Sequence, residues 1–98
     1  MADTVVKHIL DSSEALSALR LTSADECPNL EMLLSDADSE LESATGHNWA
    51  GDTTTDPEAK VAAMLYLISV HEGNELPQSY TYKVMHLDAK AKEMADNV

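Results

Sequence analysis

The sequence predicts an all-α fold, a small bundle of about four helices with a long loop between the second and third helices. Apolar residues recur at steps of three and four along most of the chain, which is the period of a helix packed on one side. Residues that cap helices stand at the ends of these segments. The chain has no Phe, one Trp and three Tyr, so its core depends on aliphatic side chains and five Met, which suit helix packing better than a β-sandwich.

The chain of 98 residues has the length of one small domain. We expect residues 1–98 to form that domain, with an N-terminal arm over residues 1–10 and a C-terminal helix and tail over residues 80–98. The arm has two interpretations, because Val5, Val6, Ile9 and Leu10 suit either a short extended lead-in or packing on another subunit.

The first helix is predicted to be short and to begin at Asp11 or Ser12, either of which is a good N-cap. Glu14 then lies in the first turn, where a carboxylate satisfies free backbone N–H groups. A polar connection over residues 22–26 follows. The apolar face of this helix comprises Ala15, Leu16, Leu19 and Leu21.

The second helix is predicted to begin with Pro28 at its first position and to end at Thr45, because Gly46 suits the left-handed residue that closes a helix. Apart from its apolar stripe, this helix is almost entirely acidic or Ser. The predicted stripe comprises Leu30, Leu33, Leu34, Ala37, Leu41 and Ala44.

Residues 47–55 show no helical period and are predicted to form the long loop. Trp49 is the one large apolar residue in it. Two interpretations remain open: Trp49 folds back as a lid on the core, or it anchors a partner, since Trp is enriched in buried interface anchors.

The third helix has the clearest ends, with Asp56 as N-cap, Pro57 at the first position and Gly73 as the closing residue. Between them, residues 61–68 form an unbroken run of eight apolar residues, which predicts a helix covered on all sides. The run is too short for a membrane span, which needs about 20 apolar residues. The cover must therefore be protein.

We expect one face of this third helix to be covered within the subunit, namely Val61, Leu65 and Ile68. The opposite side, around Met64 or Tyr66, is expected to be completed by neighbouring copies. A last helix is predicted to begin near Ser79 and to fray in its final turn. Its apolar side comprises Tyr80, Val84, Leu87, Ala91 and Met94.

The formal net charge of −12 is concentrated in the first half of the chain. Residues 1–56 carry twelve acidic and two basic residues, a balance of −10, whereas residues 57–98 carry six acidic residues and four Lys, a balance of −2. Such a surface repels nucleic-acid backbones and anionic lipid. Cys27 is alone, so no intramolecular disulfide is possible, and no apolar stretch at the N-terminus is long enough for a signal peptide. These features favour a reducing compartment.

The residues predict no enzyme, no cofactor and no metal site. The alternating acids of residues 36–42 resemble the opening of a calcium loop, but Leu41 stands where the turn glycine is needed. The chain has no Gly-rich phosphate loop. Zinc is not supported either, because none of the four histidines has an i, i+4 partner or a neighbouring Cys. The histidines are His8, His47, His71 and His86.

The order of these features resembles the head–tail connector (head-completion or adaptor) proteins of tailed bacteriophages and prophages, over roughly residues 8–80. An ILDSSEALSALRL lead precedes an acidic helix that ends in Thr45–Gly46, with Trp49 close behind. The third helix then begins at Asp56–Pro57, ends in His–Glu–Gly and is followed by a Leu–Pro turn.

The resemblance implies a structural virion protein of the phage neck, made in the host cytoplasm. A homo-oligomeric ring of about 12 copies would join the portal protein to the stopper or tail-completion protein. DNA would pass through the ring without sequence-specific binding, and no membrane would be involved. On this reading the interface candidates are His47, Trp49, Asp52, Tyr66, Tyr80 and Tyr82, and the channel-lining candidates are Glu31, Asp38 and Glu42.

An alternative class remains, an acidic helical binding module that acts on a host protein as a DNA mimic or regulator. It predicts a monomer or dimer that competes with DNA for a basic site. A resemblance to acyl carriers is weaker, because Asp11–Ser12 precedes the first helix, whereas carriers need an Asp-Ser-Leu at the start of the second.

Overall fold

The computed structural model describes residues 8–96, and most of the predicted N-terminal arm, together with residues 97–98, lies outside the described residues. Within residues 8–96 the fold is all-α, with four α-helices and no strand, as the sequence predicts. A long segment joins the second and third helices and contains one short 3₁₀ turn. The elements are α1 (Ser12–Leu19), η1 (Ala24–Glu26), α2 (Leu30–Thr45), η2 (Trp49–Gly51), α3 (Pro57–Glu72) and α4 (Gln78–Asp96).

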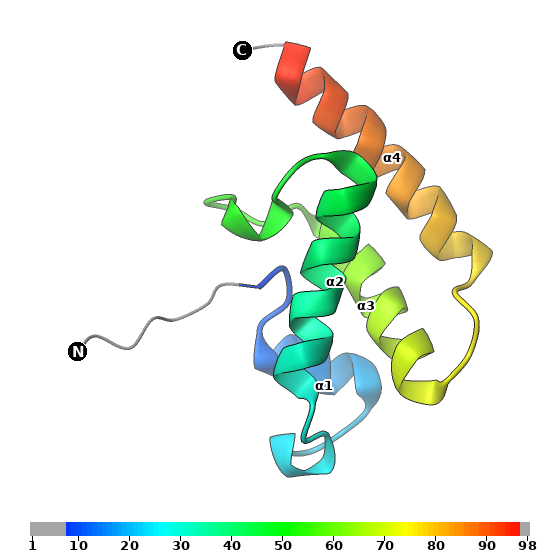
Figure 1. Cartoon of the computed structure of the whole chain (residues 1–98). Helices are drawn as coiled ribbons and strands as arrows, with labels where there is room; N and C mark the ends of the chain where they lie inside the picture. The colour runs from blue at the N-terminus through cyan, green and yellow to red at the C-terminus, as the bar shows by residue number, and fades with distance from the viewer. Residues whose placement is uncertain (1–7, 97–98) are drawn as a thin grey trace.

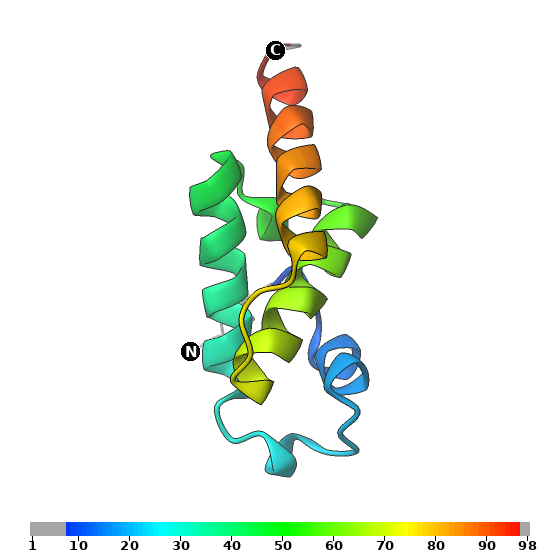
Figure 2. The ribbon, with the colours of Figure 1, turned by 90° about the vertical axis from the view of Figure 1, so that its right-hand side faces the viewer.

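Helix α3 is the centre of the bundle. It lies between α1 and α2, and α4 packs on both α3 and α2 (Figures 1 and 2). The C-terminal part of α4 projects beyond the ends of the other helices (Figure 2). The third helix thus has protein neighbours on three sides.

Helix α1 begins with a complete capping box. The Asp11 carboxylate accepts from the Glu14 backbone N–H at 2.7 Å, and the Glu14 carboxylate accepts from the Asp11 backbone N–H at 3.0 Å. The helix closes at Arg20, whose φ of 61° places a non-glycine residue in the left-handed region. The apolar face is as predicted, with Ala15 buried and its neighbours packed against the core.

Helix α2 begins at Leu30, so the prediction that Pro28 opens it is wrong. Pro28 and Asn29 instead occupy the middle of a turn in which the Leu30 N–H donates to the Cys27 carbonyl at 3.1 Å. Proline suits the second position of such a turn, because its φ is fixed near the required value. The closing residue is Gly46, as predicted, with a φ of 77°.

The buried stripe of α2 follows the prediction except at its last member. Ala44 is exposed and Thr45 is buried in its place. The step from Leu41 to Thr45 keeps the four-residue spacing that holds one face of a helix toward the core. The hydroxyl of Thr45 is satisfied there, because it donates to the Leu41 carbonyl at 2.7 Å.

Helix α3 has the predicted ends, with the Asp56 carboxylate accepting from the Glu58 N–H at 2.8 Å and Gly73 in the left-handed conformation. The prediction that Val61, Leu65 and Ile68 form the covered face is wrong. Val61 is 40% exposed, and the other two are half-buried. The face turned into the bundle carries three alanines, which let neighbouring helices approach closely. Its buried apolar residues are Ala59, Ala62, Ala63 and Leu67.

The core lies where α2, α3 and α4 meet, and it extends under the loop that follows α2. Helix α4 contributes Tyr80, Leu87 and Ala91, whereas Met94 is exposed because this end of α4 projects past the bundle. Ile9 and Leu10 are also buried, so the described end of the predicted arm packs on its own domain. The largest fully buried side chains are Trp49, Ile9, Leu10, Leu34, Leu41, Leu67 and Leu87.

Candidate interaction surfaces

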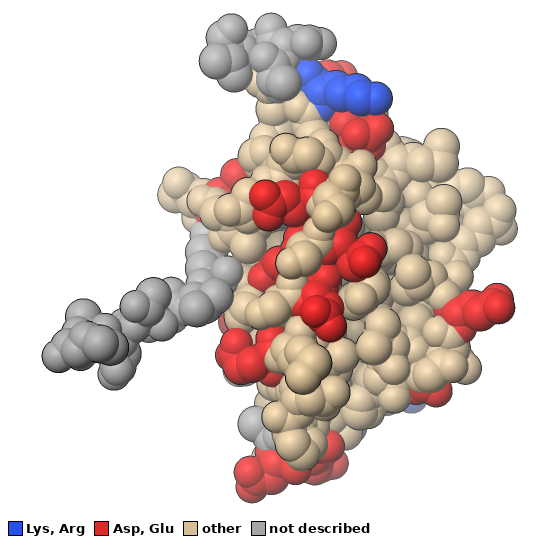
Figure 3. All heavy atoms as spheres, in the orientation of Figure 1, with Lys and Arg blue, Asp and Glu red and all other residues tan. Residues whose placement is uncertain are grey.

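Acidic side chains gather along the outer side of α2. Figure 3 shows them as a band down the front of the molecule, while the side of α4 seen in the same view is largely neutral. Three exposed carboxylates of α2, those of Asp36, Glu40 and Glu42, make no ion pair within residues 8–96. We call these three residues the acidic stripe.

Two of the predicted channel-lining residues, Glu31 and Asp38, have a different environment from the third. His8 lies between them, with Nδ1 2.6 Å from Asp38 Oδ2 and Nε2 2.8 Å from Glu31 Oε2. Glu42 has no such partner and lines a shallow hollow with Ser39, Ser43 and Gly46. Of the three candidates, Glu42 is thus the one whose charge His8 does not offset.

No pattern in the sequence predicts the His8 contacts, because His8 is 23 residues away from Glu31 and 30 residues away from Asp38. Burial of the imidazole lowers the pKa of His8, but hydrogen bonds and charge attraction from Asp38 and Glu31 outweigh burial, and the net effect raises it. The imidazole therefore holds its proton more tightly than a free histidine does.

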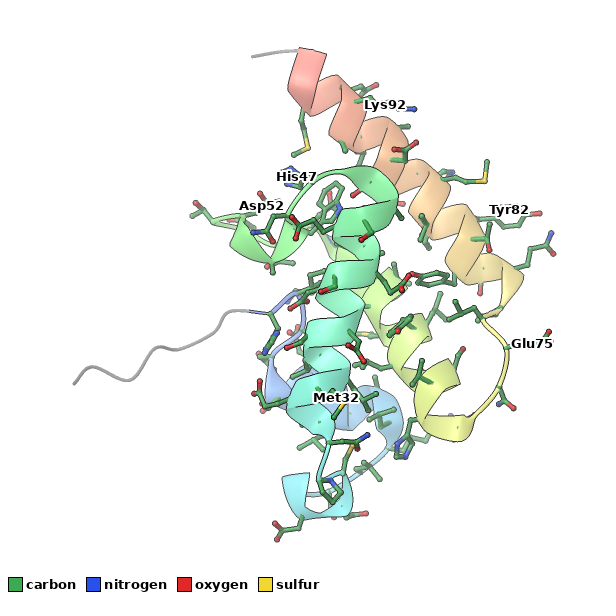
Figure 4. All side chains as sticks on the ribbon, in the orientation of Figure 1. Met32, His47, Asp52, Glu75, Tyr82 and Lys92 are labelled. Atoms are coloured by element: carbon green, nitrogen blue, oxygen red, sulfur yellow. The ribbon has the colours of Figure 1, made fainter. Side chains whose placement is uncertain are left out.

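The loop after α2 brings three of the predicted interface candidates into one cluster. His47 Nε2 lies 2.9 Å from Asp52 Oδ1, and the His47 ring meets the Trp49 ring edge-on with centroids 4.5 Å apart. Figure 4 shows His47 and Asp52 turned toward each other. The indole N–H of Trp49 donates to the Thr45 hydroxyl at 2.8 Å. This cluster fixes the loop against the end of α2.

Trp49 is 1% exposed, which confirms the interpretation that it is a lid on the core. The prediction that Trp49 is an interface residue is wrong, because its indole has no exposed surface to offer a partner. The physical reason lies in Thr45, which supplies the acceptor that a buried indole N–H needs. Only the spacing of four residues between Thr45 and Trp49 was visible in the sequence.

The three predicted tyrosines have different environments. Tyr80 is buried and lies 6.1 Å from Tyr66, measured between ring centroids. Burial, then the nearby charge of Glu40, raises the pKa of Tyr80 to about 12, and burial also raises that of Tyr66. Tyr82 is 54% exposed and points away from α4 (Figure 4). Of these three tyrosines, Tyr82 is the one whose ring is open to a partner.

Exposed apolar side chains accompany Tyr82 on α4. Met85, three residues further along, is 60% exposed, and Ala89 continues the same side of the helix. Gln78 hydrogen-bonds the Tyr82 hydroxyl at 2.9 Å. We call Gln78, Tyr82, Met85 and Ala89 the α4 face. It is neutral, unlike the band on α2.

Three basic residues of α4 are held by acids at the start of α3, namely Lys83, His86 and Lys90. Lys90 Nζ lies 2.6 Å from Glu58 Oε1 and 3.2 Å from Asp56 Oδ2, and Lys83 and His86 also approach Glu58. Donating hydrogen bonds to Glu58 and Asp56 raises the pKa of Lys90, and accepting the hydrogen bond from Lys90 lowers the pKa of Glu58. These contacts tie α4 to α3.

Another hollow lies between α1 and α3 and is open and mostly apolar, lined by Ser13, Glu14, Ser17, Ala18 and Met64. Within residues 8–96 no group of three or more His, Cys, Asp or Glu side chains is placed to hold a metal ion. In the same range no helix has the length and apolar character to cross a membrane.

Comparison of the chain with protein-family models, with curated proteins and with solved structures found no match. The molecule offers two candidate surfaces, an acidic stripe on α2 and a neutral, partly apolar α4 face, and a loop cluster that stabilises the domain.

Proposed function

We propose that this protein is a structural subunit of a phage head–tail connector. In this proposal about 12 copies form a ring, since head-to-tail interfaces close when the rotation between copies closes. The ring joins the portal protein to the stopper or tail-completion protein. The protein is made in the host cytoplasm and resides in the neck of the virion.

The observation that carries the proposal is the division of the surface into two kinds. The acidic stripe on α2 presents Asp36, Glu40 and Glu42 without neutralising partners among residues 8–96, whereas the α4 face is neutral and exposes Tyr82 and Met85. A subunit of a ring around DNA needs both kinds of surface. One meets neighbouring protein and the other repels the nucleic acid that passes.

The α4 face suits the protein contact, because aromatic residues and Met are enriched in interface cores. Tyr82 is amphipathic, and Met85 is flexible enough to fit an irregular neighbour. Met64, for which the sequence predicts cover by a neighbouring copy, lines the open hollow between α1 and α3. A head-to-tail contact brings together two different surfaces of this kind.

The acidic stripe suits the channel, because unpaired carboxylates repel phosphates and leave DNA free to move. This assignment keeps Glu42 from the predicted channel-lining set and adds Asp36 and Glu40. Glu31 and Asp38 contribute less, since the His8 imidazolium offsets part of their charge.

The decisive experiment mixes the full chain with portal rings from the same phage or prophage genome and measures native mass. We expect a ring of about 12 copies on the portal. The double variant Tyr82→Asp, Met85→Asp should fold but fail to join the ring, whereas Ser23→Asp, an exposed change in the α1–α2 connection, should assemble normally.

A wild-type chain that stays monomeric with portal rings present would remove the connector proposal. Cryo-electron microscopy then tests the channel assignment separately. The acidic stripe should line the inner wall of the ring, and a ring with Asp36, Glu40 and Glu42 on its outer wall would contradict that assignment.

A second candidate is the acidic binding module, a DNA mimic or regulator. The same acidic stripe favours it, because unneutralised carboxylates on α2 attract a basic surface that otherwise binds phosphates. Its test is competition: the full chain should displace DNA from a basic host protein, and the triple variant Asp36→Asn, Glu40→Gln, Glu42→Gln should lose this ability. The connector proposal instead predicts that this variant still assembles.

A further inference from the structure

His8 is the first residue that the structure describes, and it lies against α2. Its side chain is 6% exposed, with a carboxylate on each side of the ring: Asp38 at 2.6 Å from Nδ1 and Glu31 at 2.8 Å from Nε2. An ionised carboxylate only accepts hydrogen bonds, so both ring nitrogens must carry a proton to satisfy these contacts. The geometry is therefore that of an imidazolium.

The Asp38 carboxylate also holds the backbone at Ile9. The Ile9 N–H donates to Asp38 Oδ1 at 3.0 Å, so the two oxygens of Asp38 hold the His8 ring and the next peptide group together. Ile9 and Leu10, which follow, are buried in the core. The contact with α2 thus positions the whole segment 8–10.

We propose that His8 is a proton-dependent clasp, which holds residues 8–10 on α2 while the imidazole is doubly protonated and releases them when it loses a proton. A neutral imidazole has one lone pair, which would face a carboxylate oxygen at the distance of the lost hydrogen bond. That contact becomes repulsive and the segment detaches. Opening frees Glu31 and Asp38 and so adds two unpaired carboxylates to the side of α2.

The direction of the pH response follows from the charges that face the ring. Asp38 and Glu31, both on α2, are the charged groups that act on His8 within residues 8–96, and together they raise its pKa in the folded state. A raised folded-state pKa gives stability that is fully present below the unfolded value of about 6.5. That stability is lost as the pH rises through the folded-state pKa, so the clasp opens on the alkaline side.

Trypsin provides a local readout, because Lys7 directly precedes the clasp. A protease must bind several residues on both sides of the cut bond in extended form, and Ile9 and Leu10 are not accessible while buried. Cleavage after Lys7 therefore requires release of residues 8–10. A free peptide with the sequence of residues 1–12 serves as the reference, because dividing by its cleavage rate removes the pH dependence of trypsin itself.

In the wild-type full chain, the cleavage rate relative to the peptide should rise at least several-fold as the pH rises through the His8 pKa. The His8→Gln variant should be cleaved rapidly at every pH, without that rise. Circular dichroism at each pH must show an intact helical domain, so that local release is distinguished from global unfolding. The control is His71→Gln, an exposed change at the end of α3, which should behave as the wild type.

A second measurement keeps the test independent of variant folding. The His8 ring proton is followed by NMR in the wild type, where it should titrate above pH 6.5, and in Asp38→Asn, where its titration should move to lower pH. A relative cleavage rate that does not change with pH, or a His8 titration at or below the ordinary value, would overturn the proposal. Either result leaves the connector proposal untouched, because ring assembly is measured separately.

Discussion

The indole N–H of Trp49 donates a hydrogen bond to the hydroxyl of Thr45 at 2.8 Å, and the same hydroxyl donates to the Leu41 carbonyl at 2.7 Å. The Thr45 oxygen also accepts from the His47 backbone N–H at 3.3 Å. One hydroxyl at the last residue of α2 thus organises the turn that follows. It explains how a polar side chain is accommodated at the edge of an aliphatic core.

Replacing this hydroxyl should destabilise the protein, since Thr45→Val keeps the shape but leaves the buried indole N–H without an acceptor. We expect the free energy of unfolding to fall by about 1–3 kcal/mol, the cost of an unsatisfied buried polar group. Urea denaturation followed by Trp49 fluorescence measures it. Thr54→Val, an exposed change in the same loop, is the control, and equal midpoints for the two variants would contradict the assigned role.

The buried and exposed sides of α3 should respond differently to substitution. Leu67 is fully buried, so Leu67→Ala should cost about 2–5 kcal/mol through lost burial and the cavity left behind. Val61→Ala, on the exposed side of the same helix, should change stability by about 0.5 kcal/mol or less. Thermal denaturation of both variants checks this, and a larger loss for Val61→Ala would restore the face expected from the sequence.

Local signals in the sequence predicted most of the fold. The start of α1 and both ends of α3 followed from Asp11, Asp56 and Gly73, because a cap acts on backbone groups within a few residues of itself. The stripe of α2 followed from apolar spacing. In α3 the same reasoning failed, since an unbroken apolar run does not reveal which side of the helix faces the core.

The contacts at the candidate surfaces join residues that are far apart in the sequence. Local sequence patterns therefore could not predict them. His8 meets residues on α2, and Lys60 Nζ lies 2.6 Å from Glu14 on α1, 46 residues earlier. Such pairs arise only when helices are placed in space. The acidity of α2 was plain from its sequence, but which of its carboxylates stay unpaired required the structure.

Arg20 offers a route to a more stable protein. Its φ of 61° strains a residue with a Cβ, so Arg20→Gly should stabilise the domain by about 0.5–1 kcal/mol, net of the entropy that glycine loses on folding. Gly46→Ala is the reciprocal change, because a Cβ there meets nothing within 4 Å but the φ of 77° remains unfavourable. Melting temperatures should move up for the first variant and down for the second.

Glu14 should account for part of the loss of folding stability at acidic pH. The hydrogen bond from Lys60, then that from the Asp11 backbone, lowers its pKa in the folded state. A lowered pKa gives stability that is present above the unfolded value of about 4.3 and is lost as the pH falls through the folded value. Stability curves below pH 5 should therefore fall less steeply in Glu14→Gln. Glu75→Gln, an exposed change in the loop before α4, should leave the slope unchanged.

Tyr80 should determine how folding stability falls at alkaline pH. Its pKa of about 12, raised by burial and by the charge of Glu40, exceeds the unfolded value of about 10, so the folded state keeps a proton that the unfolded state releases. Stability should consequently fall between pH 10 and 12, by an amount on the order of 2 kcal/mol. Tyr80→Phe removes the titrating group and should flatten this decline. Urea denaturation at pH 7 and pH 11 measures the difference, and Tyr82→Phe, which alters an exposed ring, should keep the wild-type decline.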